Sequence, residues 1–65
     1  MRQELRDRSG WLVGWREQNG DRINGRNHAG RLVGWYDPRH DETRDYSGRL
    51  VGYGDVLSAL ITSGL

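Results

Sequence analysis

The chain has 65 residues, of which 34% are apolar, and it contains no cysteine. A domain of this size lies near the lower limit for burying a self-sufficient core, and no disulfide or thiolate zinc site can compensate. Ten arginines, with no lysine, face nine acidic residues for a net charge of +1, so the chain lacks the basic block typical of nucleic-acid binders.

Three segments of the chain follow one pattern, Arg-[Asp/Asn]-x-[Ser/Ala]-Gly-x-Leu-Val-Gly-[Trp/Tyr]. They span residues 6–15, 26–35 and 44–53 and recur at spacings of 20 and then 18 residues. Five of the ten positions are identical in all three segments. The pattern therefore indicates an internal repeat, in which each copy is one supersecondary unit.

Each repeat is predicted to form a β-hairpin. Asp or Asn followed three residues later by Gly is typical of a turn, because the side chain can accept backbone N–H groups and Gly adopts the left-handed conformation. Leu-Val-Gly-Trp, or its Tyr variant, is then the second arm. The first arms are expected at residues 4–7, 22–27 and 42–45. Asn19-Gly20-Asp21 predicts a turn between the first two hairpins, and residues 37–41 predict a longer loop between the last two.

A glycine recurs inside each second arm, at Gly14, Gly34 and Gly52. Glycine weakens the interior of a strand, so its repetition needs a structural reason. The favoured interpretation is a bulge or bend that curves each hairpin. The alternative is that another backbone or an aromatic ring packs directly over the glycine.

The second arms carry apolar residues on both faces. Simple alternation places Val13 and Trp15 on one face and Leu12 on the other, with the same arrangement in the other two repeats. The first arms are mostly polar and cannot cover both faces. We therefore expect a homo-oligomer, a dimer or a tetramer, with one apolar layer inside the protomer and one between protomers.

The C-terminal segment departs from the repeat. Asp55 can cap a short helix, expected over residues 55–62 and ending near Gly64. Val56, Leu57, Leu60 and Ile61 fall on one face at helical spacing, which predicts either a plug for the core or an oligomer contact. The fold class expected from these elements is all-β: one domain, residues 1–65, of three antiparallel hairpins (about 4–17, 22–36 and 42–53) with a short C-terminal helix.

The motifs resemble those of known hairpin families. Asp45 with the run 46–50, Tyr-Ser-Gly-Arg-Leu, resembles the core of the YD repeats of large secreted and toxin-associated shells, which occur in long arrays. Across residues 4–61 the pattern Asp-x-x-Gly-x-x-[Val/Ile]-Gly-[Trp/Tyr] is more similar to small bacterial proteins of the four-fold β-flower type. That resemblance implies a chain made of hairpins, sometimes followed by a short apolar segment. It supplies no catalytic residues, because that family is functionally uncharacterised.

A weaker resemblance is to cell-wall-binding repeats, which hold choline or a sugar between aromatic rings. It rests on the segments 9–12, Ser-Gly-Trp-Leu, and 34–36, Gly-Trp-Tyr. The Trp-Tyr-Tyr run of that family is absent here, and the charged first residues do not form a signal peptide. We expect a cytoplasmic protein that is not associated with a membrane.

No residue pattern predicts catalysis, a cofactor or a metal, and we expect a protein that is not an enzyme. His40, Asp41 and Glu42 with Asp37 are interpreted as a solvated loop, and Ser9 and Ser47 as turn residues. The repeated arginines are expected in cross-strand salt bridges along the arms, with a ring that binds an anion or a strand of nucleic acid as the alternative. The aromatic residues are expected in the core or at an interface, with a stacking platform as the alternative. The candidate binding or interface residues are Arg6, Arg26, Arg44, Trp11, Trp15, Trp35, Tyr36, Tyr53, Leu57, Leu60 and Ile61.

The sequence thus favours a non-catalytic binding or scaffolding module that self-assembles. Two alternatives stay open at this point. One is a nucleic-acid-binding protein that uses the repeated arginines and aromatic residues, against which the balanced charge argues. The other is a small-ligand-binding protein that uses aromatic cages.

Overall fold

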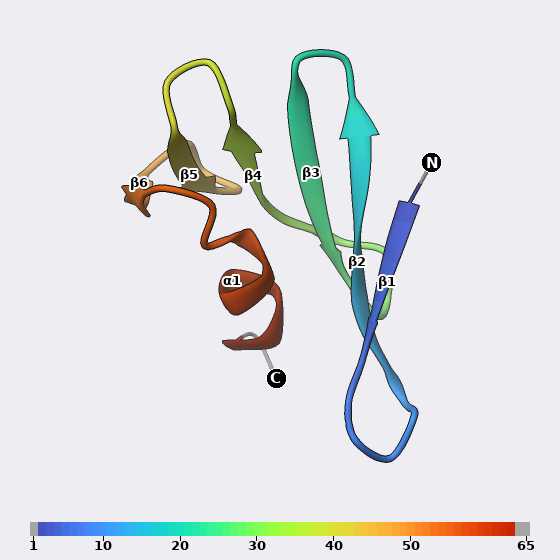
Figure 1. The fold of residues 1–65 in the computed structure, drawn as a ribbon. Coiled ribbons are helices and arrows are strands. Elements are labelled where there is room, and N and C mark those ends of the chain that lie inside the picture. Colours follow the sequence, from blue (N-terminus) through green and yellow to red (C-terminus); the bar gives the residue numbers. More distant parts are fainter. Residues whose placement is uncertain (1, 64–65) are drawn as a thin grey trace.

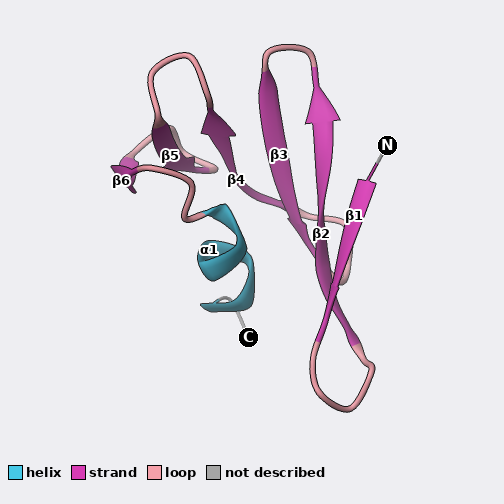
Figure 2. Ribbon diagram, viewed as in Figure 1, coloured by secondary structure: helices cyan, strands magenta, loops and turns pink. Residues whose placement is uncertain are grey.

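In a computed structural model, which describes residues 2–63, the chain forms an antiparallel sheet of six strands and one short helix (Figure 1). The elements in chain order are β1 (Arg2–Arg6), β2 (Leu12–Asn19), β3 (Arg22–Asn27), β4 (Leu32–Asp37), β5 (Glu42–Asp45), β6 (Leu50–Tyr53) and α1 (Leu57–Ser63). Each strand pairs with the next along the chain, so the sheet is a meander with β1 and β6 at its edges. The all-β prediction, with three antiparallel hairpins and a C-terminal helix, is confirmed (Figure 2).

The hairpin turns have the same construction in all three repeats. In the first, Asp7 Oδ1 accepts hydrogen bonds from the backbone N–H groups of Ser9 and Trp11 at 2.9 and 3.0 Å. Asn27 and Asp45 bind their own turns in the same way. The turn glycines have φ of +85° to +90°, which is the left-handed conformation that the sequence predicted. The same turn residues and hydrogen bonds therefore produce three equivalent hairpins.

Each hairpin carries a bulge immediately before the strand glycine. Leu5 pairs with Gly14 and Arg6 pairs with Leu12, which leaves Val13 as the extra residue. Val33 and Val51 are the extra residues in the other two hairpins. A bulge shifts the alternation of side chains by one position. The expectation that Val13 and Trp15 share a face is therefore wrong: Leu12 and Trp15 share a face, and Val13 lies in the core with α1.

The helix packs onto the sheet where the strand glycines leave space. A Cβ atom placed on Gly14 would lie 2.6 Å from Cγ2 of Ile61, and one on Gly34 would lie 2.6 Å from Cδ2 of Leu60. The same two Cβ positions are also only 2.1 and 2.3 Å from a carbonyl oxygen of the adjacent strand. The bulge interpretation and the close-packing alternative thus both describe these positions, although the covering side chains are aliphatic rather than aromatic. Gly25, on β3, makes similar room for Leu57.

The helix face of the sheet holds the hydrophobic core. Leu57 and Ile61 are fully buried and form a cluster with Val13, against which further partly buried side chains pack: Leu5, Ile23, Val33, Tyr36 and Leu60. Leu57, Leu60 and Ile61 of the predicted stripe therefore plug the core, which is one of the two expectations. The inclusion of Val56 in the stripe was wrong, because Val56 precedes α1 and is exposed. Figure 1 shows α1 lying against the sheet, and its contacts are with β2, β3 and β4.

Polar groups fix the position of the helix. Asp55 Oδ1 accepts a hydrogen bond from the backbone N–H of Leu57, so it acts as the predicted cap, although the helix spans Leu57–Ser63 rather than residues 55–62. The expected end near Gly64 lies outside the described residues. Arg16 on β2 binds both carboxylate oxygens of Asp55, at 3.0 and 2.6 Å. Thr43, fully buried on β5, donates to the carbonyl of Gly54 and accepts from the N–H of Val56.

The strand glycines give a first prediction. Gly34→Ala should lower the free energy of unfolding by about 2 kcal/mol or more, because the added methyl group meets both a carbonyl oxygen and the helix. Gly52→Ala is the matched control at a protein concentration low enough to keep the chain monomeric, since a Cβ atom there meets nothing within 4 Å in the same chain. Circular dichroism during heating measures both. Equal loss of the cooperative transition in the two variants would contradict this account of the packing.

The contact between Arg16 and Asp55 gives a second prediction. The hydrogen bond from Arg16 lowers the pKa of Asp55 below its ordinary value. A carboxyl whose pKa is lower in the folded state stabilises the fold above its unfolded-state pKa, and that contribution is lost as the pH falls through the folded-state pKa. Asp55→Asn should therefore be less stable than the unsubstituted chain at neutral pH, and should lose less stability on acidification.

Melting temperatures measured from neutral pH down to below the usual aspartate range provide the test. Asp21→Asn is the control, because the ion pair of Asp21 with Arg39 is largely exposed, at 80% for the Asp21 side chain. Parallel melting curves for the unsubstituted chain and Asp55→Asn would refute the role given to this pair.

Candidate functional site

The face of the sheet opposite α1, called the open face from here on, gathers six of the candidate residues. Directly opposed residues of neighbouring strands share a face. Trp15 is opposite Arg26, Trp35 is opposite Arg44, and the remaining pairs connect these strands into one surface. The candidates on the open face are Arg6, Arg26, Arg44, Trp15, Trp35 and Tyr53. The bulges bring them together, since they turn each Leu and each Trp or Tyr to the same side.

The other candidates lie elsewhere. Tyr36 packs against the core on the helix face. Trp11 lies at the end of the first hairpin turn and is 74% exposed. Leu57 and Ile61 are fully buried in the chain, and Leu60 covers Gly34. An oligomer contact through Leu57 or Ile61 is therefore wrong for this structure, because neither side chain reaches the surface.

The three repeated arginines have one structural role in common. Each donates from Nη1 to the carbonyl oxygen of the turn glycine four residues later: Arg6 to Gly10, Arg26 to Gly30 and Arg44 to Gly48, at 2.8 to 2.9 Å. Each also pairs with a glutamate, namely Glu4, Glu17 and Glu42 respectively. Only the second pair crosses between strands, so the expected cross-strand pairing is wrong for Arg6 and Arg44, whose glutamates lie two positions away on the same strand. The arginines therefore clamp the turns from the open face.

The tryptophan rings of the open face are partly covered by other arginines. The guanidinium carbon of Arg2 lies 4.2 Å from the ring centroid of Trp15, and that of Arg22 lies 4.6 Å from the ring centroid of Trp35. Both distances are typical of cation–π contacts. Each guanidinium group occupies one face of its ring, so a stacked base or sugar could not use that face. The open face is thus engaged in contacts within the chain.

Glu4 and Glu17 are two of the three anions of this network. Hydrogen bonds from Arg2 and Arg6 lower the pKa of the Glu4 carboxyl. A 2.7 Å hydrogen bond from the Trp15 indole, supported by Arg26, lowers the pKa of Glu17. Both carboxylates therefore remain charged at neutral pH and compensate the neighbouring arginines.

Sequence reasoning missed the glutamates and the arginines that cover the rings. A signal was present: Glu4 precedes Arg6 by two residues, and Glu42 precedes Arg44 by two, which is the spacing of one strand face. In the second repeat that position is Asn24, and Glu17 on the neighbouring strand supplies the anion instead. This exchange is visible only once the pairing of β2 with β3 is known.

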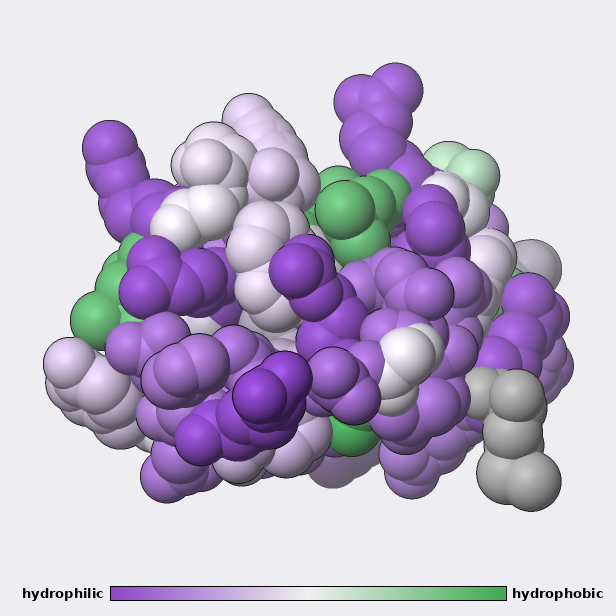
Figure 3. Space-filling model, turned by 90° about the horizontal axis from the view of Figure 1, so that it is seen from above, coloured by the Kyte–Doolittle hydropathy of each residue, from purple (hydrophilic) through white to green (hydrophobic). Residues whose placement is uncertain are grey.

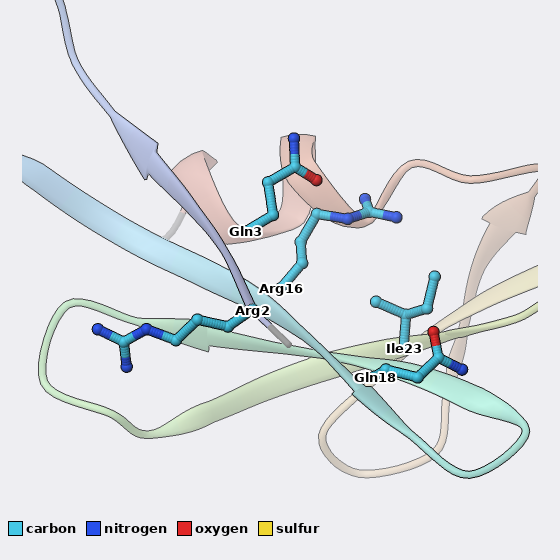
Figure 4. Close-up of a pocket in the computed structure, with 5 residues that line it drawn as sticks. All are labelled: Arg2, Gln3, Arg16, Gln18 and Ile23. Atoms are coloured by element: carbon cyan, nitrogen blue, oxygen red, sulfur yellow. The ribbon is translucent and has the colours of Figure 1, made fainter.

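A shallow hollow lies near the start of β1. It has a volume of about 220 Å³ and is lined by Arg2, Gln3, Arg16, Gln18 and Ile23 (Figure 4). Arg16 is already bound to Asp55, and Arg2 to Glu4. The hollow therefore offers no uncompensated charge for a ligand.

The acidic side chains of the loop between β4 and β5 contact neighbouring residues of the same loop region. His40 Nδ1 lies 2.8 Å from Asp37 Oδ2, and this contact lowers the pKa of Asp37. The hydroxyl of Tyr36 donates to Asp41 at 2.6 Å, and this bond raises the pKa of Tyr36. Among residues 2–63, no group of three or more histidine or acidic side chains is arranged to hold a metal ion.

Comparisons with protein-family models, with curated proteins and with solved structures find no match for this chain. The resemblances to hairpin families stay predictions. Within the described part of the chain, no helix has the length and apolar character needed to cross a membrane.

The clamp formed by Arg26 gives a third prediction. Arg26→Ala should lower the free energy of unfolding by about 1 kcal/mol, because the turn carbonyl and Glu17 both lose a charged donor. Arg31→Ala, at an exposed position in the same turn, should change it by less than about 0.5 kcal/mol. Chemical denaturation measures both values. Unchanged stability in Arg26→Ala would instead favour the alternative in which the repeated arginines serve a ligand.

Proposed function

We propose that the protein is a non-catalytic scaffolding or binding module that acts as a homo-oligomer, a dimer or a tetramer. The observation that carries the proposal is the uneven exposure of large hydrophobic side chains. Apart from Trp11, those that are exposed among the described residues all lie between residues 46 and 56: Tyr46, Leu50, Val51, Tyr53 and Val56. Such a cluster on one part of a small domain is typical of an interaction surface.

The small size of the core supports the same proposal. Among residues 2–63 only Val13, Leu57 and Ile61 are buried hydrophobic residues. A domain with so little buried apolar surface gains stability when a partner covers more of it. The face in Figure 3 is mostly hydrophilic, with small separate hydrophobic groups. A second copy of the chain could cover this apolar surface without any other molecule.

The two alternative functions receive less support. Single-stranded nucleic acid binds through free cations and open aromatic faces. The open-face arginines Arg6, Arg26 and Arg44 are bound to turn carbonyls and glutamates. The rings of Trp15 and Trp35 carry guanidinium groups, which also argues against an aromatic cage for a small ligand.

Self-association is the fourth prediction. Size-exclusion chromatography with light scattering should show one discrete oligomer at micromolar protein concentration, at both low and high salt, because apolar contacts are not screened. A folded monomer at both salt concentrations would refute the proposal. An assembly that dissociates in high salt would show that charge, rather than the apolar cluster, holds the copies together.

A further inference from the structure

The two edges of the sheet are different and match each other. Inside the chain, the second arm of one hairpin pairs with the first arm of the next, as β2 does with β3 and β4 with β5. At one edge, β6 is a second arm that pairs with its own first arm, β5, and has no following first arm on its other side. At the other, β1 is a first arm with no second arm before it. Figure 1 shows these two strands on opposite sides of the molecule.

The two internal junctions, where β2 pairs with β3 and β4 pairs with β5, share one register. At the first, Gly14 is opposite Asn27 and Trp15 is opposite Arg26. At the second, Gly34 is opposite Asp45 and Trp35 is opposite Arg44. In repeat positions, the strand glycine faces the Asp or Asn of the next turn, and the aromatic residue faces the repeated arginine. The same rule pairs Gly52 and Tyr53 with Asp7 and Arg6 of a second copy.

The residues at the two edges lack the neighbours that their equivalents have. Tyr53 is 73% exposed, whereas Trp15 and Trp35 are half-buried. Arg6 is opposite Leu12 alone, whereas Arg26 and Arg44 each also face a tryptophan on their other side. One edge therefore has an aromatic residue without its arginine, and the other has an arginine without its aromatic residue.

The space around Gly52 shows that the neighbouring backbone is also missing at this edge. A Cβ atom at Gly14 or Gly34 would lie 2.1 or 2.3 Å from the carbonyl oxygen of Arg26 or Arg44 on the next strand. At Gly52 it would meet nothing within 4 Å. Glycine is thus required at the first two positions by a strand that passes close by, and within one chain nothing requires it at the third.

We propose that copies of this chain associate head to tail, with β6 of one copy paired to β1 of the next in the register of the internal junctions. The pairing continues the meander from one chain into another. It is short, because the chain turns away at Gly54, where φ is +83°. Exposed Leu50, Val51 and Tyr53 supply apolar surface beside it. Such a contact joins two different surfaces, so it produces a closed ring if the rotation closes and an open filament if it does not.

This inference rests on the proposed self-association and specifies its geometry. A self-complementary contact, in which the same patch of both copies meets, is the competing arrangement. The natural absence of cysteine allows the two to be separated by disulfide trapping. Directly opposed residues on antiparallel strands have Cα atoms about 4.5 to 5.5 Å apart, which a disulfide can span.

The experiment uses the single variants Tyr53→Cys and Arg6→Cys. After mild oxidation, each variant alone should remain free of disulfide, and an equimolar mixture should give a covalent dimer that contains one copy of each. The double variant should give a series of longer covalent chains or a covalent ring. Disulfide-linked dimers from a single variant alone would overturn the head-to-tail pairing.

A second measurement uses Gly52→Ala. In the proposed register the added methyl group meets the carbonyl oxygen of Arg6 from the next copy, so association should weaken by about tenfold or more. The circular dichroism spectrum should stay unchanged, since the protomer has space for the group. His28→Ala, in an exposed turn, is the control and should associate like the unsubstituted chain.

The outcomes separate the two proposals. A monomeric unsubstituted chain would overturn both the proposed function and the pairing. An oligomer that is unaffected by Gly52→Ala would leave self-association in place and overturn the pairing of β6 with β1. Weakened association of folded Gly52→Ala, together with disulfides only in the mixture, would establish the pairing.

Discussion

The bulge and the glycine that follows it in each second arm are the constraint on which the rest of the structure depends. The bulge at Val13 or Val33 turns the valine toward the helix and leaves the leucine before it on the open face. The glycine then allows both the neighbouring strand and the helix to approach within distances that a Cβ atom would prevent. One short motif thus sorts side chains to two faces, curves the sheet and makes the place where α1 docks.

The two faces created in this way are stabilised by different kinds of interaction. The helix face is apolar, and the helix that covers it is fixed by Arg16, Asp55 and Thr43. The open face has no covering element in the described chain and is held by arginines that bind turn carbonyls, glutamates and tryptophan rings. A guanidinium group suits this role because its planar donors can satisfy a carbonyl and a carboxylate together. At these positions arginine therefore has a structural advantage over lysine.

The sequence predicted the hairpins well because their signals are local. The turn residues and the first arms at 22–27 and 42–45 agree with β3 and β5, since Asp or Asn and Gly act within a few residues. The sequence predicted poorly which side chains share a face of the sheet. Simple alternation assumes a regular ladder of strand pairs, and one extra residue at a bulge reverses the faces of the residues that follow it. The repeated arginines were recognised as partners of carboxylates. Glu17 was not, because its contact with Arg26 depends on which strand lies beside it.

Repetition also determines how the sheet ends. A meander of similar hairpins leaves its two terminal strands, β1 and β6, each without a neighbour on one side. In this chain the helix lies against β2, β3 and β4, and it leaves β6 with exposed Val51 and Tyr53. An exposed strand edge is a template for pairing unless charge, proline or a covering element blocks it. The strand Leu50–Tyr53 contains none of these blocking residues, and in the proposed pairing its neighbour is the β1 strand of another copy.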